Sequence, residues 1–148
     1  MALEDNKTWV FISYAREDEK YAKKLHKNLR TAGLNPWLDT EEILPGVPWK
    51  IAIRKGIQSS KYFIALLSSN SVEKKGYVKK ELKQALSIFE EMSPTQIFIV
   101  PVKLDNCKIS NRVINSRHIE DLSKNWNQGI SRILLSMGVS EDFLTVID

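Results

Sequence analysis

Residues 71–91 carry the clearest sign of chemistry in the chain, because an acidic residue lies at the border of an apolar helical stripe. At about 100° per residue, one face of the expected helix collects Val78, Leu82, Ala85 and Phe89. Glu81 falls on the shoulder of this face, and Tyr77, one turn earlier, shares that shoulder. A half-buried carboxylate beside an aromatic ring can stabilise a developing cation, since a low dielectric strengthens the attraction. The alternative is that Glu81 pairs with a nearby lysine or caps a backbone group.

Further candidates follow the segments that we expect to be strands. Ligands of open parallel sheets bind at the carboxyl ends of the strands, which points to residues 13–16, 39–49 and 68–71 and to the first turns of the helices after them. The chain has no glycine-rich phosphate loop of the dinucleotide or Walker type and no spacing typical of a Ser-His-Asp triad. The usual nucleotide-binding motifs are therefore absent.

The histidines and the cysteine are weak candidates for a catalytic or metal site. Cys107 is the one cysteine, so it can neither form an internal disulfide nor join a cysteine cluster, and we expect no metal site. His26 has no acidic partner three or four residues later, and we expect it at the surface. His118 borders a weak strand pattern and is expected to be structural. Trp126, Ile130, Ile133 and Leu134 form a helical stripe that indicates core packing.

Short apolar runs alternate with amphipathic segments about five times, which predicts an α/β fold on a parallel sheet. Strands are expected at residues 8–14, 34–39, 62–68, 96–102 and 117–122. Helices are expected from residue 18 to a C-terminal Gly33 and at residues 49–58, 71–91 and 126–137. Residues 40–48 form a loop that is longer than usual between a strand and a helix, and the Pro45-Gly46 pair predicts a tight turn within it. That length favours a functional role for the loop.

The 148 residues, 43% hydrophobic and 27% charged, predict one globular domain. No leader and no apolar stretch of membrane-spanning length is evident, so we expect a soluble, cytoplasmic protein. The net charge of +4 favours anionic partners in general. The lysines lie mostly on outer helix faces without interleaved aromatic residues, and a nucleic-acid partner is not expected.

Together these segments resemble the Toll/interleukin-1 receptor (TIR) domains, the bacterial members in particular. The resemblance covers about residues 8–137 and is carried by residues 11–14 with Arg16 and Asp18, residues 37–39, Ile43, Pro45-Gly46 with Trp49, residues 64–68 and residues 77–82. It implies a flavodoxin-like sheet of five parallel strands in the order 2-1-3-4-5, with helices on both faces. Residues 1–148 would then be one TIR domain, and since such domains are commonly fused to a sensor or oligomerisation domain, the chain can be a part of a longer protein.

Many bacterial members cleave the bond between nicotinamide and ribose in NAD+, with no metal or further cofactor, and some cyclise the ADP-ribose. The resemblance implies an NAD+ nucleosidase or ADP-ribosyl cyclase, and it leaves a linear or a cyclic product open. Glu81 occupies the position of the essential glutamate, and Tyr77 that of an aromatic residue that is more often tryptophan. Trp49 would stack a substrate ring, and Arg16 would lie near the phosphates.

Two of the implied binding residues have a plain alternative. Ser13 would line the pocket floor or satisfy a backbone group, and Asp39 would touch substrate or, as we prefer, order the start of its loop through backbone hydrogen bonds. For Arg16 the alternative is an ordinary surface arginine.

The family further implies activation by TIR–TIR assembly through the second loop, in bacterial immune or abortive-infection signalling. That assembly loop is Glu41, Glu42, Ile43, Leu44, Pro45, Gly46, Val47 and Pro48. A non-catalytic scaffold for homotypic signalling is the alternative, and the acid at Glu81, which scaffold members often lack, favours the enzyme. A nucleoside deoxyribosyltransferase-like enzyme fits the long loop and Trp49 poorly.

Overall fold

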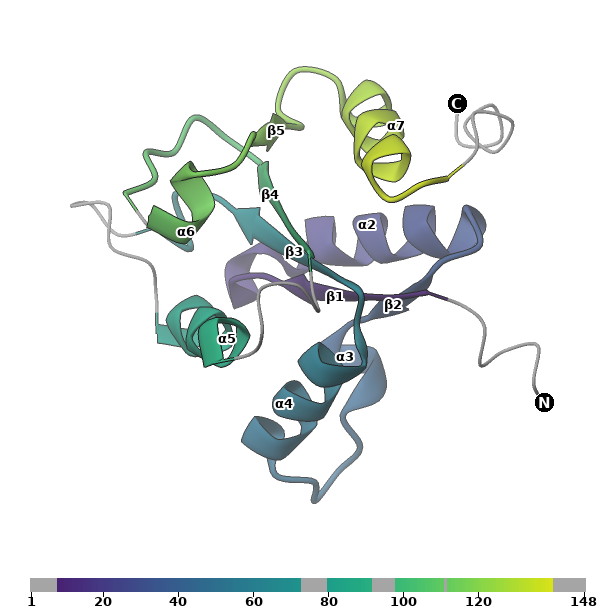
Figure 1. Cartoon of the computed structure of the whole chain (residues 1–148), viewed down its shortest axis with the longest axis vertical. Coiled ribbons are helices and arrows are strands. Elements are labelled where there is room, and N and C mark those ends of the chain that lie inside the picture. The colour runs from purple at the N-terminus through teal and green to yellow at the C-terminus, as the bar shows by residue number, and fades with distance from the viewer. Residues whose placement is uncertain (1–7, 73–79, 92–97, 111, 140–148) are drawn as a thin grey trace.

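The computed structural model describes residues 8–72, 80–91, 98–110 and 112–139. Its centre is a five-stranded, fully parallel sheet in the order β2-β1-β3-β4-β5 (Figure 1). The strands are β1 (Trp9–Ser13), β2 (Asn35–Trp37), β3 (Tyr62–Leu67), β4 (Phe98–Lys103) and β5 (Glu120–Asp121). The expected fold class and strand order are therefore confirmed.

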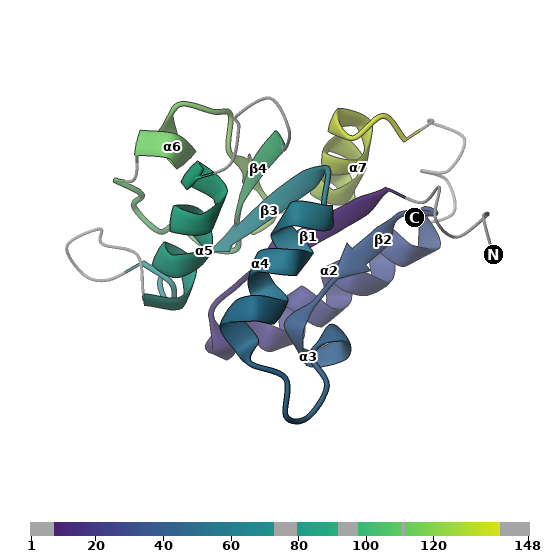
Figure 2. The ribbon, with the colours of Figure 1, turned by 60° about the horizontal axis from the view of Figure 1, so that its bottom comes forward.

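The helices lie on both faces of this sheet (Figure 2). They are the 3-10 turn η1 (Arg16–Asp18), α2 (Glu19–Thr31), α3 (Asp39–Glu42), α4 (Trp49–Ser59), α5 (Lys80–Glu91), α6 (Arg112–Asn115) and α7 (Trp126–Ser136). α2 and α7 cover one face, and α4 and α5 cover the other (Figure 1). Both faces of the sheet are thus protected from water.

Alternate residues of the central strands feed two separate cores. In β3, Tyr62, Ile64 and Leu66 pack with α2 and α7, while Phe63, Ala65 and Leu67 pack with α4, α5 and α6. All six residues of β3 are buried. This two-sided burial explains why the strand sequences are continuous apolar runs rather than alternating ones.

Three aromatic rings tie the first three strands together. Phe11 of β1 is in register with Trp37 of β2 and with Phe63 of β3. Its ring stacks on both neighbours, at centroid distances of 4.8 Å to Trp37 and 5.2 Å to Phe63. Aromatic pairs at such distances add stability beyond the area that they bury. This ladder forms a rigid base on the α4 side of the sheet.

The structure corrects several predicted boundaries. The second strand, expected to end at Asp39, ends at Trp37. Asp39 and residues 40–42, which were expected as loop, form the helical turn α3, whose three acidic side chains suit the positive end of a helix dipole. Ser71 and Val72, expected as helix, are not helical, because the Ser71 hydroxyl and the Ser68 backbone close a turn there. The helix that follows is described from Lys80 onward.

Two corrections concern the C-terminal third. The fifth strand has two residues instead of the expected six, and the Asp121 carboxylate accepts a hydrogen bond from the Ser123 backbone, which turns the chain away from the sheet. The short helix α6 was not expected from the sequence. The last helix ends one residue before the predicted bound, and its stripe of Ile130, Ile133 and Leu134 is buried in the core as expected.

Candidate functional site

A pocket of about 500 Å³ lies where β1 and β2 end, at the carboxyl edge of the sheet. Its residues come from β1 and the turn after it, from β2 and α3, and from the first turns of α4. They are Phe11, Ile12, Ser13, Tyr14, Arg16, Trp37, Asp39, Thr40, Ile43, Trp49 and Ile53. This is the edge at which open parallel sheets bind their ligands.

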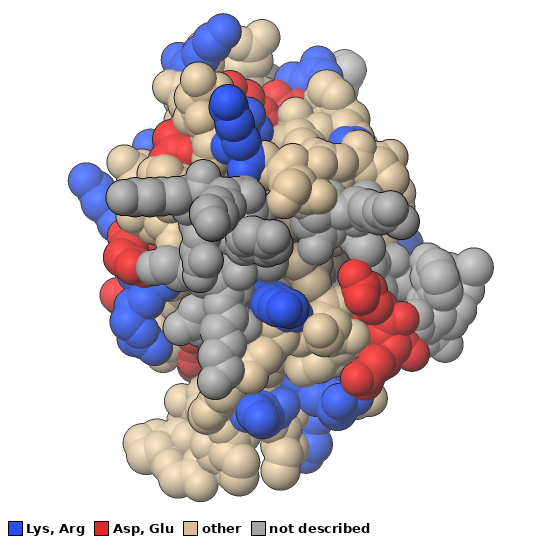
Figure 3. Space-filling model, turned by 90° about the vertical axis from the view of Figure 1, so that its left-hand side faces the viewer, with Lys and Arg blue, Asp and Glu red and all other residues tan. Residues whose placement is uncertain are grey.

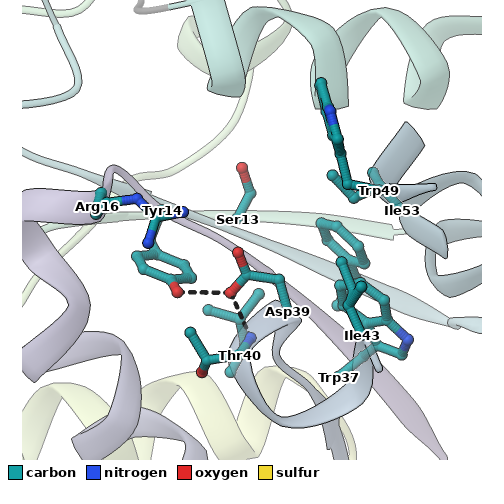
Figure 4. A pocket seen from close by; sticks show the side chains of 11 residues that line it. Ser13, Tyr14, Arg16, Trp37, Asp39, Thr40, Ile43, Trp49 and Ile53 are labelled. Atoms are coloured by element: carbon teal, nitrogen blue, oxygen red, sulfur yellow. Dashed lines mark hydrogen bonds between the residues drawn. The ribbon is translucent and has the colours of Figure 1, made fainter. Parts of the chain in front are cut away.

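The pocket has an apolar half and a polar half (Figure 4). Trp49 and Ile53 stand on one side above Ile43 and Trp37, and Arg16, Tyr14 and Asp39 face them across the pocket. The two residues of α4 lie four positions apart and so share one helix face. Such an arrangement suits a ligand that joins a flat ring to a polar, anionic part.

Asp39 accepts two hydrogen bonds within this site. Its Oδ1 accepts one hydrogen bond from the Tyr14 hydroxyl at 2.5 Å and another from the Thr40 backbone N–H at 2.8 Å. Burial, the hydrogen bond to Asp39 and the charge of Asp39 raise the pKa of Tyr14 well above its ordinary value. Tyr14 therefore remains a protonated donor at all physiological pH values.

Two of the predicted binding residues, Trp49 and Arg16, are accessible at the rim of the pocket. Trp49 is 46% exposed at the start of α4, and Lys50 lies 5.9 Å from the centre of its ring. Arg16, the first residue of η1, is exposed beside Tyr14 (Figure 4). Both side chains can move toward a ligand without unpacking the core.

The structure thus gathers Ser13, Arg16, Asp39 and Trp49 around one pocket, although they come from three separate segments. Ser13 is nearly buried at the end of β1, and its side chain lines the same space. Asp39 does order the start of its own segment, through the Thr40 N–H, and it lines the pocket as well.

Glu81 is the second residue of α5, and its side chain, like the whole of Tyr77, lies outside the described residues. α5 follows β3 in a parallel sheet, so the start of this helix belongs to the carboxyl edge that also carries the pocket. At its other end, Glu91 accepts a hydrogen bond from Arg54 of α4 at 3.1 Å. α4 and α5 are therefore fastened side by side.

Residues 68–71, also expected near a site, do not line this pocket and anchor the loop after β3. The buried carboxylate of Asp18 accepts hydrogen bonds from the Ser68 hydroxyl and, at 2.8 Å, from the Asn70 side chain. On the other side, Asp105 accepts from the backbone N–H and the hydroxyl of Ser69. Partial burial opposes ionisation of Asp105, but these bonds outweigh it and its pKa is lowered.

Residues 44–48 of the assembly loop are exposed and carry no charge, and Glu41 at the start of the loop is exposed as well. Leu44 is 67% exposed and Val47 is 43% exposed, and the lowest part of the molecule in Figure 3, where this loop lies, is an uncharged surface. Gly46 has a φ of +87°, which favours glycine at that turn. Burial raises the pKa of Glu42, and the charge of Glu41 adds to the effect while Arg30 opposes it.

Six lining residues were not predicted as site residues: Phe11, Ile12, Tyr14, Trp37, Thr40 and Ile53. Tyr14 and Thr40 lie within the strand-end ranges 13–16 and 39–49, but no role was predicted for either. Ile53 could have been found from its spacing of four residues from Trp49. His26, expected at the surface, is partly buried, and its Nε2 is buried without a hydrogen-bond partner among the described residues. Burial and then the charge of Arg30 lower the pKa of His26, and the charge of Glu41 opposes this shift.

The remaining chemical candidates lie apart from the pocket. Cys107 is a free, buried thiol whose pKa is raised to about 11 by burial and by the charge of Asp105. Within the described ranges, no three His, Cys, Asp or Glu side chains cluster closely enough to hold a metal ion. None of the helices in these ranges has the length and apolar character needed to cross a bilayer.

Comparison with known sequences and structures gives a consistent picture. The family model of the TIR domain matches residues 10–134. NAD(+) hydrolase PdTIR of Paracoccus denitrificans (strain Pd 1222) is 34% identical over 94 residues, which are 63% of this chain and 30% of the relative. 2' cyclic ADP-D-ribose synthase AbTIR of Acinetobacter baumannii (strain 1295743) is 27% identical over 125 residues, 77% of this chain and 46% of the relative. The chain spans less than half the length of either relative.

Solved structures share the fold at low sequence identity. The TIR domain of the Toll-related receptor TRR-2 from Hydra magnipapillata superposes with a TM-score of 0.65 at 21% identity, over 90% of this chain and 96% of that one. The RPS4 and RRS1 TIR domain heterodimer gives a TM-score of 0.61 at 15% identity, over 89% and 96%. The second structure shows that TIR domains can pair with each other.

Proposed function

Since this chain belongs to the TIR domain family, we propose that it cleaves NAD+ between nicotinamide and ribose and that Glu81 is the catalytic residue. The observation that carries the proposal is the pocket at the carboxyl edge, where an aromatic half and a polar half with Arg16 adjoin. The names of two bacterial relatives, an NAD+ hydrolase and a cyclic ADP-ribose synthase, support the same chemistry.

The proposed reaction breaks the C–N bond between ribose C1′ and the nicotinamide ring nitrogen, and the electron pair leaves with nicotinamide, which becomes neutral. Positive charge develops on the sugar, and the Glu81 carboxylate stabilises it while it binds the ribose hydroxyls. Water then forms the new C1′–O bond and releases a proton, or a nucleophile within the ADP-ribose attacks instead and gives a cyclic product. Chromatography of the products distinguishes the two outcomes.

The other pocket residues have binding roles in this scheme. Trp49 stacks on a ring of the substrate, Arg16 approaches the diphosphate, and Ser13 and Asp39 complete the polar contacts. Tyr77 supplies the aromatic ring next to Glu81. The apolar half, Ile43 and Ile53 included, excludes water from the ring. NAD+ is the substrate, and the scheme uses no metal or further cofactor.

Glu81→Ala tests the assignment directly. Nicotinamide release and NAD+ loss are measured under conditions that favour assembly, and we expect the variant to lose at least about a hundredfold in rate, as when a group that stabilises transition-state charge is removed. Glu90→Ala, which changes an exposed acid on the same helix, is the matched control and should retain the parent's rate. An inert parent, or equal activity in Glu81→Ala, would contradict the assignment.

We further propose that assembly with other TIR domains activates the enzyme, through the loop of residues 41–48. The exposed Leu44 and Val47 support this, because an accessible apolar loop is suited to an interface. Activity per subunit should rise steeply with protein concentration, and a flat rate across a wide dilution series would count against assembly. Leu44→Asp should lower that rise and leave the melting temperature unchanged.

The exposed loop also supports the second candidate, a non-catalytic scaffold that signals by TIR–TIR pairing. An inert parent that nevertheless assembles, with Leu44→Asp abolishing assembly, would favour it. For the enzyme, the setting that we propose is bacterial immune or abortive-infection signalling in the cytoplasm, where NAD+ is available and where a fused or separate sensor would trigger assembly.

A further inference from the structure

Asp39 receives both of its hydrogen bonds from described residues on one carboxylate oxygen. The Tyr14 hydroxyl and the Thr40 N–H each donate to Oδ1. Figure 4 shows the second oxygen of Asp39 turned away from both donors, toward the interior of the pocket. A carboxylate held in this way presents one oxygen of fixed orientation to a ligand.

Tyr14 is well suited to hold that orientation. Its ring packs against the core cluster between the sheet and α2, which fixes the position of the hydroxyl. The hydroxyl has a single proton, and that proton goes to Asp39. The link also crosses 25 residues of sequence, so it joins the turn after β1 to the start of α3.

The chemistry of the free oxygen limits what it can bind. A carboxylate oxygen accepts hydrogen bonds, and it repels phosphate groups at close range. In the proposed substrate, the donors are the ribose hydroxyls and the amide and amino groups of the two rings. The rings suit the apolar half of the pocket, around Trp37 and Trp49, which leaves a ribose opposite Asp39.

We propose that Tyr14 is a positioning residue that fixes Asp39 so that its free oxygen accepts a hydrogen bond from a ribose hydroxyl of the substrate. This inference rests on the proposed NAD+ cleavage and assigns one polar contact within the same pocket. Tyr14 acts through Asp39 and makes no contact with the reacting bond.

Tyr14→Phe tests the inference, because it removes only the hydroxyl and keeps the packed ring. Loss of one positioning hydrogen bond should raise the KM for NAD+ roughly three- to tenfold and leave kcat within about twofold. Asp39→Asn should raise KM at least as much, and the double variant should be no worse than Asp39→Asn, because both changes interrupt one path. Tyr21→Phe, at an exposed tyrosine of α2, is the matched control and should match the parent.

A binding measurement shows whether Asp39 contacts a ribose hydroxyl or an amide or amino group of a substrate ring. It also shows whether Tyr14 positions Asp39 or has only a structural role. Calorimetry with ADP-ribose should show the same loss of affinity for Tyr14→Phe. An analogue that lacks the ribose hydroxyl bound by Asp39 should bind the parent and Tyr14→Phe with equal affinity. Equal loss with every analogue would overturn the inference in favour of a general structural effect.

The outcomes also distinguish this inference from the proposed function. A parent that cleaves NAD+ with an unchanged KM in Tyr14→Phe contradicts only the inference. A parent that binds ADP-ribose in a Tyr14-dependent way but cleaves no NAD+ supports the inference and contradicts the function. A parent that binds neither NAD+ nor ADP-ribose overturns both.

Discussion

The buried carboxylate of Asp18 provides the sharpest test of how the site loops are held. Asp18 is 2% exposed and lies in η1, directly after the strand that carries Ser13, and it binds Ser68 and Asn70 of the loop after β3. Asp18→Ala would leave the Ser68 hydroxyl, itself 1% exposed, without this acceptor. Two loops at the carboxyl edge would then lose their shared anchor.

The expected cost follows from what each donor can do afterwards. An unsatisfied buried donor costs about 1–3 kcal/mol, and this applies to Ser68. Asn70 is exposed and can turn to water, so its loss adds only a few tenths of a kcal/mol, on the order of a surface hydrogen bond. A total of about 1–3 kcal/mol corresponds to a fall of roughly 2–12 °C in melting temperature for a chain of this size.

Thermal and urea unfolding of four proteins check the reasoning: the parent, Asp18→Ala, Ser68→Ala and the double variant. In the Ser68→Ala background, the second substitution should cost about 1 kcal/mol less than it does alone, because the stranded donor is already gone. Full additivity of the two single effects, or a cost below about 0.5 kcal/mol for Asp18→Ala, would refute this account.

Three further perturbations have defined outcomes. Burial, with a smaller contribution from Arg30, lowers the pKa of His26 from 6.5. The contribution of neutral His26 to stability should therefore be fully present above pH 6.5 and fall as the pH drops toward the pKa of the folded state. His26→Gln should flatten this slope in urea unfolding between about pH 5 and 7. Hydrogen bonds from Ser69 outweigh the effect of burial and lower the pKa of Asp105 from 3.8. Asp105→Asn should therefore reduce the loss of stability on acidification below about pH 4, and an unchanged acid transition would contradict this contribution of Asp105. Gly56→Ala would place a Cβ 2.5 Å from the Trp37 ring. This overpacking should cost about 1–3 kcal/mol of stability, lower the melting temperature and change the tryptophan fluorescence. An unaltered melting curve would show that α4 can shift to make room for the added methyl group.

The sequence predicted best those strands that are buried on both faces and those helices that bury one face. The continuous apolar runs of β1, β3 and β4 and the amphipathic stripes of α2 and α7 carry enough signal to place these elements within a few residues. The two-residue strand β5 and the short helices α3 and α6 carry too little, because their ends are decided by local hydrogen bonds rather than by a long pattern.

For the candidate site, the sequence indicated which strand ends to inspect but not which side chains meet there. Ser13, Arg16, Asp39 and Trp49 were selected from strand ends, from the start of a helix and from the family resemblance, and they line one pocket. Tyr14 lies within the range 13–16 that the sequence marked, but the sequence predicted no role for it. The chain leaves the strand after Ser13, and the hydroxyl then reaches Asp39.

By itself the sequence determined the α/β class, the carboxyl edge as the place to look for a candidate site, and the family resemblance, because all three depend on local patterns of residue type. Only the tertiary structure decided that Tyr14 holds Asp39, that Asp18 ties the turn after β1 to the loop after β3, and that the Trp37 ring lies against Gly56. These contacts join residues 19 to 52 positions apart, and their geometry depends on how the sheet brings the loops together.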